Sequence, residues 1–193
     1  MTKLHSARPL WVLIAAVLIV ALAGCSSTIS PGKLFGRGKA KVKTNAPPNC
    51  PSISILADAA TLTRFARPGT TDITDTLYDA QILKVAIKCK VEGGVVRTEF
   101  GVSGSITLGP SGTPGQTDLP IFAALTLKDQ DVLRKITRDS SVTIKAGKRT
   151  ANFIEIVKRF EFRLAAGKAA TDYEILTGFN LTPAQVKYNQ RYQ

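Results

Sequence analysis

From residue 50 onward, apolar and polar residues alternate along the chain with a period of two. Within residues 83–92, lysines, an alanine and a glutamate occupy one side of an extended chain, and the other side carries Leu83, Val85, Ile87, Cys89 and Val91. Such alternation is typical of an antiparallel strand with one buried face, because successive side chains of a strand point to opposite faces. The pattern predicts strands over residues 52–56, 83–92, 95–108, 121–127, 132–144 and 153–164.

Two of these predicted strands have a well-defined apolar side. Residues 95–108 place on one side Phe100, Val102, Gly104, Ile106 and Leu108. In residues 153–164, charged residues alternate with an apolar side made of Ile154, Ile156, Phe160, Phe162 and Leu164. Lys158 interrupts that apolar side, which indicates a β-bulge or the end of the strand.

Turn sequences separate the predicted strands. Gly93 and Gly94 form a tight turn, since glycine readily takes positive φ. Residues 127–132 predict a second hairpin turn, and residues 109–118 predict a long loop. Six or seven strands with one apolar face each favour two sheets packed face to face. We therefore predict an all-β fold for residues 50–193, an immunoglobulin-like antiparallel β-sandwich.

The end of the domain has a helical signature. Thr182 suits an N-cap, Pro183 the first helical position and Gln185 the third, where its side chain completes a capping box. These signals predict a short helix over residues 182–191. The segment is polar and short, so it is only marginally stable alone. It therefore either docks on the sandwich or awaits a partner.

The first 24 residues follow a different pattern. Lys3, Arg8 and Pro9 precede residues 10–24, which contain no charged residue. A basic segment followed by a short apolar run is typical of a secretory signal peptide. A membrane-spanning helix needs about 20 apolar residues, and a core helix would carry polar residues at helical spacing. We predict that residues 1–24 form a helical signal peptide that is removed.

The apolar run ends at Leu22-Ala23-Gly24-Cys25, which resembles the lipobox of bacterial lipoproteins. The resemblance implies cleavage between Gly24 and Cys25, a diacylglycerol on the Cys25 sulfur and an acyl chain on its new amino group. Two or more chains give stable anchoring. Ser26, where an Asp would retain a lipoprotein in the inner membrane, implies the periplasmic face of the outer membrane. The alternative is an uncleaved N-terminal anchor with an incidental cysteine.

Most of the excess positive charge lies before the predicted domain. The net charge is +12, and residues 25–49 carry five basic residues and no acidic one. Their glycines and prolines, without apolar periodicity, predict a flexible linker. The linker either lies on anionic headgroups or is a solvated tether. Residues 50–193 are only mildly basic, with charges of both signs interspersed, so we expect no nucleic-acid partner.

With Cys25 lipidated, Cys50 and Cys89 remain. An even pair in an exported chain favours a disulfide, because the compartment is oxidising. Such a bridge would tie the first residues of the domain to a predicted central strand. Two buried free thiols, or a redox or metal role, are the alternatives, although neither cysteine belongs to a CxxC motif.

The sequence offers little for catalysis. The only histidine, His5, lies in the predicted signal peptide, so the mature chain lacks His-based catalysis and His-ligated zinc. Asp72, Asp75 and Asp79 form an acidic cluster, but such spacing is common in turns and helix caps. We therefore expect no enzyme, no catalytic residue, no metal and no cofactor beyond the lipid on Cys25. A hydrolase using the three aspartates is the least favoured alternative.

Three stretches of the domain resemble a family of uncharacterised alphaproteobacterial lipoproteins: CPSISILADAATLTRF, TDITD and GFNLTPAQVKYNQR, within residues 47–191. The resemblance implies no particular activity. We expect a binding or scaffolding protein of the envelope, or alternatively an accessory or carrier factor for lipid or an envelope polymer. The predicted contacts with an envelope protein partner are Tyr188, Arg191 and Tyr192, with the 64–79 region as a second surface. The sequence does not define the oligomeric state.

Overall fold

The computed structural model describes residues 46–127 and 132–192. Eight strands, three short 3₁₀ segments and one α-helix occur in these ranges. The strands are β1 (Ser52–Ile55), β2 (Thr61–Phe65), β3 (Thr76–Glu92), β4 (Val95–Leu108), β5 (Gly115–Leu127), β6 (Val132–Ile144), β7 (Thr150–Arg163) and β8 (Tyr173–Phe179). The helical segments are η2 (Ala57–Ala59), η3 (Ile73–Asp75), η4 (Ala170–Asp172) and α1 (Pro183–Tyr192).

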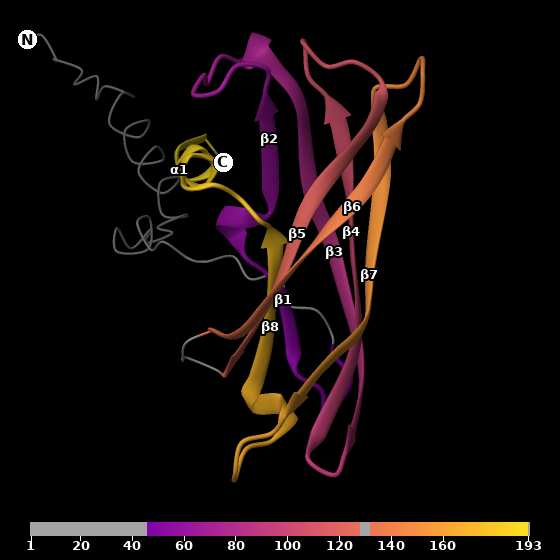
Figure 1. The fold of residues 1–193 in the computed structure, drawn as a ribbon, viewed down its shortest axis with the longest axis vertical. Helices are drawn as coiled ribbons and strands as arrows, with labels where there is room; N and C mark the ends of the chain where they lie inside the picture. Colours follow the sequence, from indigo (N-terminus) through magenta and orange to yellow (C-terminus); the bar gives the residue numbers. More distant parts are fainter. Residues whose placement is uncertain (1–45, 128–131, 193) are drawn as a thin grey trace, which may run out of the picture. The chain divides into compact units, whose positions relative to one another are not determined.

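The strands form two four-stranded sheets that pack as a sandwich. One sheet has the order β1-β8-β5-β6 and the other β2-β3-β4-β7. Figure 1 shows α1 beside β2, on the side of the sandwich away from β7. The prediction of an all-β sandwich with a short C-terminal helix is confirmed.

One strand pair is parallel. β1 and β8, near the two ends of the domain, run in the same direction, and all other pairs are antiparallel. A parallel pair requires a long connection, and here the rest of the domain supplies it. An immunoglobulin constant domain divides seven strands into four and three, whereas this sandwich has four strands in each sheet.

Large apolar side chains from both sheets fill the space between them. Phe100 of β4 and Phe160 of β7 meet edge to face, with ring centroids 5.8 Å apart. Burial of each such side chain stabilises the fold by about 1.5–3 kcal/mol. The fully buried large residues include Tyr173, Phe100, Phe160, Phe179, Ile53, Ile106, Leu119 and Ile175.

Strand β3 begins earlier than predicted and contains a β-bulge. Ile82 lies opposite Gly104 and Lys84 opposite Ser103, so Leu83 has no cross-strand partner. The bulge places Ile82 in the core and leaves Leu83 50% exposed. The predicted inward position of Leu83 is therefore wrong, while Val85 and Ile87 are buried as predicted.

The predicted apolar side of β7 is wrong in its first half. Phe153 is 3% exposed, while Ile154 is 68% exposed. Phe153 lies opposite Gly104, which has no side chain, and a Cβ at Gly104 would lie 2.5 Å from the Phe153 ring. Directly opposed residues share a face, so Phe153 occupies the space that Gly104 leaves.

The interruption at Lys158 is a β-bulge, one of the two predicted alternatives. Phe160 pairs with Thr98 and Val157 with Phe100, so two residues of β7 face one residue of β4. The extra residue reverses the alternation, which is why Val157 and Phe160 are both buried.

Two strands and parts of two others were not predicted. β2 has only five residues, which is too short for a clear alternating pattern. β8 has seven residues, of which the last three are all buried, so its alternation is incomplete. β5 begins at Gly115, inside the predicted 109–118 loop. β5 and β6 pair as a hairpin, as predicted, but turn residues 128–131 lie outside the described residues.

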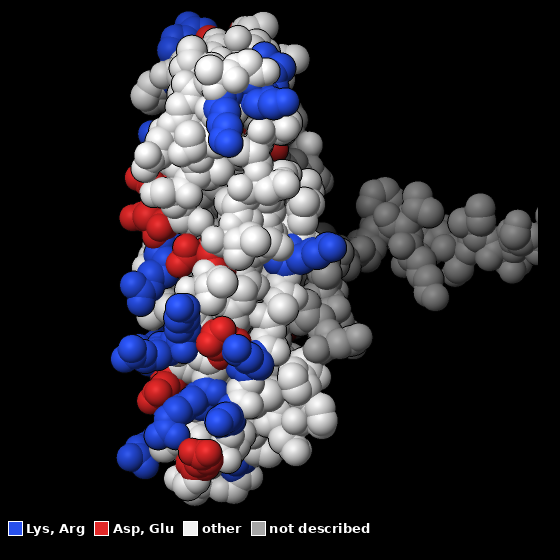
Figure 2. Space-filling model, turned by 90° about the vertical axis from the view of Figure 1, so that its right-hand side faces the viewer, with Lys and Arg blue, Asp and Glu red and all other residues white. Residues whose placement is uncertain are grey.

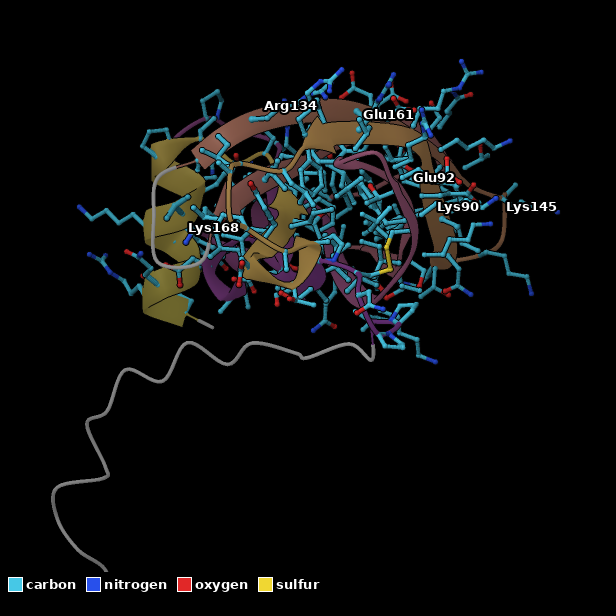
Figure 3. All side chains as sticks on the ribbon, turned by 90° about the horizontal axis from the view of Figure 1, so that it is seen from below. Lys90, Glu92, Arg134, Lys145, Glu161 and Lys168 are labelled. Atoms are coloured by element: carbon cyan, nitrogen blue, oxygen red, sulfur yellow. A yellow bond between two sulfur atoms is a disulfide. The ribbon has the colours of Figure 1, made fainter. Side chains whose placement is uncertain are left out.

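The Cys50–Cys89 disulfide is present. The two Cα atoms are 5.8 Å apart, and the bridge joins the residues just before β1 to the second half of β3. Seen from below, the yellow bond lies among the side chains of the sandwich, whereas Lys90, Glu92 and Lys145 point outward from its rim (Figure 3). The bridge therefore fastens the start of the domain to an inner strand.

The predicted signal peptide, the cleavage site at Gly24 and Cys25, and the linker up to residue 45 lie outside the described residues. Ala46, at the predicted end of the linker, already packs against the core. Within residues 46–127 and 132–192, no helix has the length and apolar character needed to span a membrane.

The two sides of β7 can be tested with a matched pair of variants. Phe153→Ala removes a buried ring, so we expect the free energy of unfolding to fall by about 3–5 kcal/mol. Ile154→Ala removes a side chain that faces solvent, and we expect a change within about 0.5 kcal/mol. Urea denaturation followed by far-UV circular dichroism measures the free energy of unfolding of both variants. Equal destabilisation by the two variants would contradict the observed orientation of β7.

Candidate functional site: a groove between β2 and α1

A groove of about 430 Å³ lies between β2, the loop that follows it and helix α1. We call it the α1–β2 groove. Its walls come from segments far apart in the sequence, namely residues 63–71 and the helix and its cap. The lining residues are Thr63, Arg64, Phe65, Ala66, Arg67, Pro68, Gly69, Thr70, Thr71, Thr182, Ala184, Gln185, Tyr188 and Asn189.

Helix α1 is held against the sandwich by Asn189. This side chain is 5% exposed, and its Nδ2 donates hydrogen bonds to the main-chain oxygens of Asp58 and Thr61, each at 2.9 Å. Gln190 adds a hydrogen bond from Nε2 to Asp58 Oδ2 at 2.7 Å. Because a short polar helix is marginal alone, these contacts determine where α1 lies.

The predicted capping box at the start of α1 is confirmed. The main-chain N–H of Gln185 donates to Thr182 Oγ1 at 3.3 Å, and the N–H of Thr182 donates to Gln185 Oε1 at 2.9 Å. The helix runs from Pro183 to Tyr192, one residue beyond the predicted end. The capping box thus determines where α1 begins, and Asn189 determines where it docks.

Aromatic rings join the helix to the end of β2. Tyr188 packs edge to face on Phe65, with ring centroids 5.3 Å apart. Tyr192 packs on Tyr188 at 4.9 Å, and the Arg191 guanidinium lies 5.9 Å from the Tyr192 ring. The three predicted contact residues therefore form one cluster at the C-terminal half of α1. Among them, Tyr188 lines the groove.

The loop wall of the groove is held by polar contacts. Arg67 donates to Asp75 Oδ2 through Nε at 2.8 Å and also through Nη2. Asp72 caps η3, because its Oδ1 accepts from the main-chain N–H of Thr74 at 2.9 Å and from the Thr74 hydroxyl at 2.7 Å. These contacts fix the path of residues 66–75 across the groove.

Two ionisable groups in this wall have shifted pKa values. The hydrogen bond and charge of Asp75 raise the pKa of Arg67. The hydroxyl and then the N–H of Thr74, both donating to the carboxylate, lower the pKa of Asp72 below its ordinary value. The cap at Asp72 is therefore fully present above that ordinary value, and it is lost as the pH falls through the lower, folded-state pKa.

The acidic cluster of the sequence is dispersed in the structure. Asp72 caps η3, Asp75 pairs with Arg67, and Asp79 accepts a hydrogen bond from the Thr63 hydroxyl at 2.6 Å. Each carboxylate thus has a local structural partner, in keeping with the interpretation of this segment as turn and cap. Across the described ranges, no group of three or more His, Cys, Asp or Glu side chains is arranged to hold a metal ion.

A second hollow, of about 390 Å³, lies where β6 and β7 meet. Arg138, Lys158 and Arg159 surround Glu155 there. Figure 2 shows this side of the molecule, where basic and acidic side chains alternate over the lower half. Because charges of both signs are mixed, this surface does not select a ligand of one charge.

The groove contains residues that sequence reasoning singled out and others that it missed. Arg64, Phe65 and Arg67 belong to the 64–79 region predicted as a second contact surface, and Tyr188 was predicted as a contact residue. Their meeting was not predicted, because it depends on Asn189, which anchors the helix to residues far away in the sequence. A buried asparagine within a polar helix is the signal that could have found it.

No family model, curated protein or solved structure matches this chain.

The anchoring role of Asn189 can be tested by hydrogen exchange. Asn189→Ala removes the hydrogen bonds to the Asp58 and Thr61 carbonyls, so we expect α1 to lose about 1–3 kcal/mol of protection against local opening. Gln190→Ala, at the exposed neighbouring contact, is the control and should cost less than about 1 kcal/mol. Unchanged protection of residues 183–192 in Asn189→Ala would show that the helix is held by other contacts.

Proposed function

We propose that this chain is a lipoprotein of a bacterial envelope, anchored through Cys25 on the periplasmic face of the outer membrane. Its folded domain acts by binding or scaffolding another envelope component, without catalysis. The α1–β2 groove is the binding site. The observation that carries this proposal is a 430 Å³ groove with aromatic and basic walls, built where α1 docks on the sandwich.

Two features support the proposed location in the periplasm. The Leu22–Cys25 tetrad follows a basic segment and an apolar run, which is the order found in lipoprotein signals. The disulfide between Cys50 and Cys89 is the kind of bridge that persists in an oxidising compartment such as the periplasm. The proposal therefore joins a signal in the first 25 residues to a chemical feature of the folded domain.

The filled core favours binding at the surface over carriage of a lipid between the sheets. A carrier of that kind needs an apolar cavity of several hundred Å³. The hollow next to Phe100, Ile121 and Val157, between the sheets, has about 10 Å³, which is close to the space of a single water molecule. We therefore place the ligand outside the core, in the α1–β2 groove. The groove has about 430 Å³, against about 10 Å³ for the hollow between the sheets, and its polar groups can orient the ligand.

The anchor is tested by Cys25→Ser. Without the thiol, the lipid cannot be attached, so we expect an uncleaved precursor that incorporates no labelled fatty acid, while the wild type incorporates it. Membrane fractionation and gel mobility follow both forms. Cys50→Ser is the matched control, because it removes a cysteine of the folded domain and should leave lipid incorporation intact. A wild type that never incorporates fatty acid would exclude the lipoprotein interpretation.

The binding role is tested in cells by a photo-crosslinking phenylalanine analogue in place of Tyr188. Since Tyr188 lines the groove, we expect a discrete adduct on irradiation. The same analogue in place of Lys84, on the outer surface of β3, is the control and should give no such adduct. Identical adduct patterns at the two positions, or none at either, would count against the groove as the binding site.

A further inference from the structure

We infer that the α1–β2 groove takes an extended acidic peptide segment of a partner protein. The segment pairs through its main chain with the edge of β2 and sets its carboxylates against Arg64 and Arg191. This inference rests on the proposed binding function and names the class of partner. Three independent features of the groove lead to it: an open strand edge, basic side chains of one sign and an aromatic floor.

The first feature is the edge of β2. β2 is the outermost strand of its sheet, paired only with β3. In an antiparallel pair, the main-chain N–H and C=O of every second residue point toward the neighbouring strand. The N–H of Ile82 donates to the oxygen of Ala60 at 2.9 Å, so the main-chain groups of Ala60 and of every second residue after it point toward β3. The main-chain groups of Thr61 therefore point away from β3, and its oxygen accepts a hydrogen bond from Asn189 of α1.

Thr63 lies two residues beyond Thr61 and has the same main-chain orientation. Its main-chain N–H and C=O therefore face away from β3, and Thr63, although only 7% exposed, borders the groove. A strand edge of this kind binds an extended peptide by main-chain hydrogen bonds, with alternate side chains supplying specificity. Since Asn189 occupies the edge at Thr61, the peptide pairs at Thr63, next to the helix.

The second feature is the charge around the groove. Arg67 is paired with Asp75, whereas Arg64 makes no ion pair with any residue of the described ranges. Helix α1 adds Lys187 and Arg191 and contains no acidic residue. Arg191 lies three residues after Tyr188 and seven after Ala184, a spacing that puts it on the helix side that lines the groove. The charged residues that line the groove, Arg64 and Arg67, are therefore both basic.

This charge also argues against the chain's own linker as the occupant. Residues 25–49 carry five basic residues and no acidic one, so they are repelled by Arg64 and Arg191. An acidic peptide meets the opposite sign. Charge-assisted hydrogen bonds between guanidinium and carboxylate groups are about twice as strong as neutral ones.

The third feature is the floor. The edge-to-face pair of Phe65 and Tyr188, together with Ala66 and Ala184, gives the groove an apolar surface. In an extended peptide, successive side chains point to opposite sides, so carboxylates on one side leave apolar side chains for the other. A peptide that alternates acidic and apolar residues therefore satisfies all three features at once.

The test uses the full-length lipidated chain in detergent micelles and a fluorescein-labelled probe, Glu-Leu-Glu-Phe-Glu-Leu-Glu. Fluorescence anisotropy gives its dissociation constant. We expect Arg64→Glu and Arg191→Glu each to weaken binding by about tenfold or more, because each loses a charge-assisted contact and gains a repulsion. Lys84→Glu makes the same charge change on the outer surface of β3, and should alter binding by less than about twofold.

Two altered probes separate the contributions. A probe with lysine in place of each glutamate tests charge, and a probe with methylated central amide nitrogens tests main-chain pairing. We expect each to bind about tenfold or more weakly than the parent. Equal binding of the acidic and basic probes, or no effect of both Arg64→Glu and Arg191→Glu, would overturn the acidic peptide. Unchanged binding of the methylated probe would overturn pairing with β2.

Failure of this inference is distinguishable from failure of the proposed function. Mass spectrometry of the adduct formed in cells at position 188 identifies the bound material as peptide, glycan or lipid. An acidic peptide adduct supports the inference. A glycan or lipid adduct overturns the peptide while the binding function stands, and the absence of any adduct contradicts the binding function itself.

Discussion

The structure depends on one constraint: each strand of the sandwich buries one face between the two sheets and exposes the other. β4 keeps strict alternation over its whole length, whereas β3 and β7 depart from it at bulges, at Leu83 and at Lys158, beyond which residues face inward again. The close contact of Phe153 with Gly104 follows from the same constraint, because the ring fills space that no side chain of β4 occupies.

The constraint leaves the edges of the sheets unsatisfied, and helix α1 satisfies part of one edge. Asn189 replaces a neighbouring strand at Thr61, supplying the donor that a ladder would have supplied. The helix in turn depends on this edge, since its own sequence is short and polar. Docking and groove are therefore one structural feature: where α1 lies against β2, the groove exists, and local opening of α1 removes its wall.

Much of the fold could be predicted from the sequence, and the limits have physical causes. The alternation in residues 95–108, the capping box at Thr182 and the Cys50–Cys89 pair each rest on local chemistry, and each is confirmed. The predicted orientation of Phe153 and Ile154 was wrong because a bulge reverses the alternation. The position of that bulge depends on the neighbouring strand. β8 was not predicted because it is only seven residues long and its last three residues are all buried, which interrupts the alternation.

The candidate site was predicted only in pieces, since Phe65 and Tyr188 are brought together by tertiary docking.

The two open sides of the sandwich differ in a way that bears on where a partner binds. On the β6–β7 side, Arg134 lies over the Phe160 ring at 5.1 Å and Lys135 over the Phe122 ring at 4.9 Å, so charged side chains cover the edge. With the bulge at Lys158, these are the devices that prevent an edge strand from pairing with another chain. The β2 side has no comparable row of charges, and its register shift lies just beyond Thr63, between Arg64 and Phe65. It is covered by a helix, whose Asn189 occupies the edge at Thr61, while Thr63, 7% exposed, lines the groove. Because charged side chains cover the β6–β7 side and Asn189 covers only Thr61 on the other, the proposed peptide pairs with β2 rather than with β6 or β7.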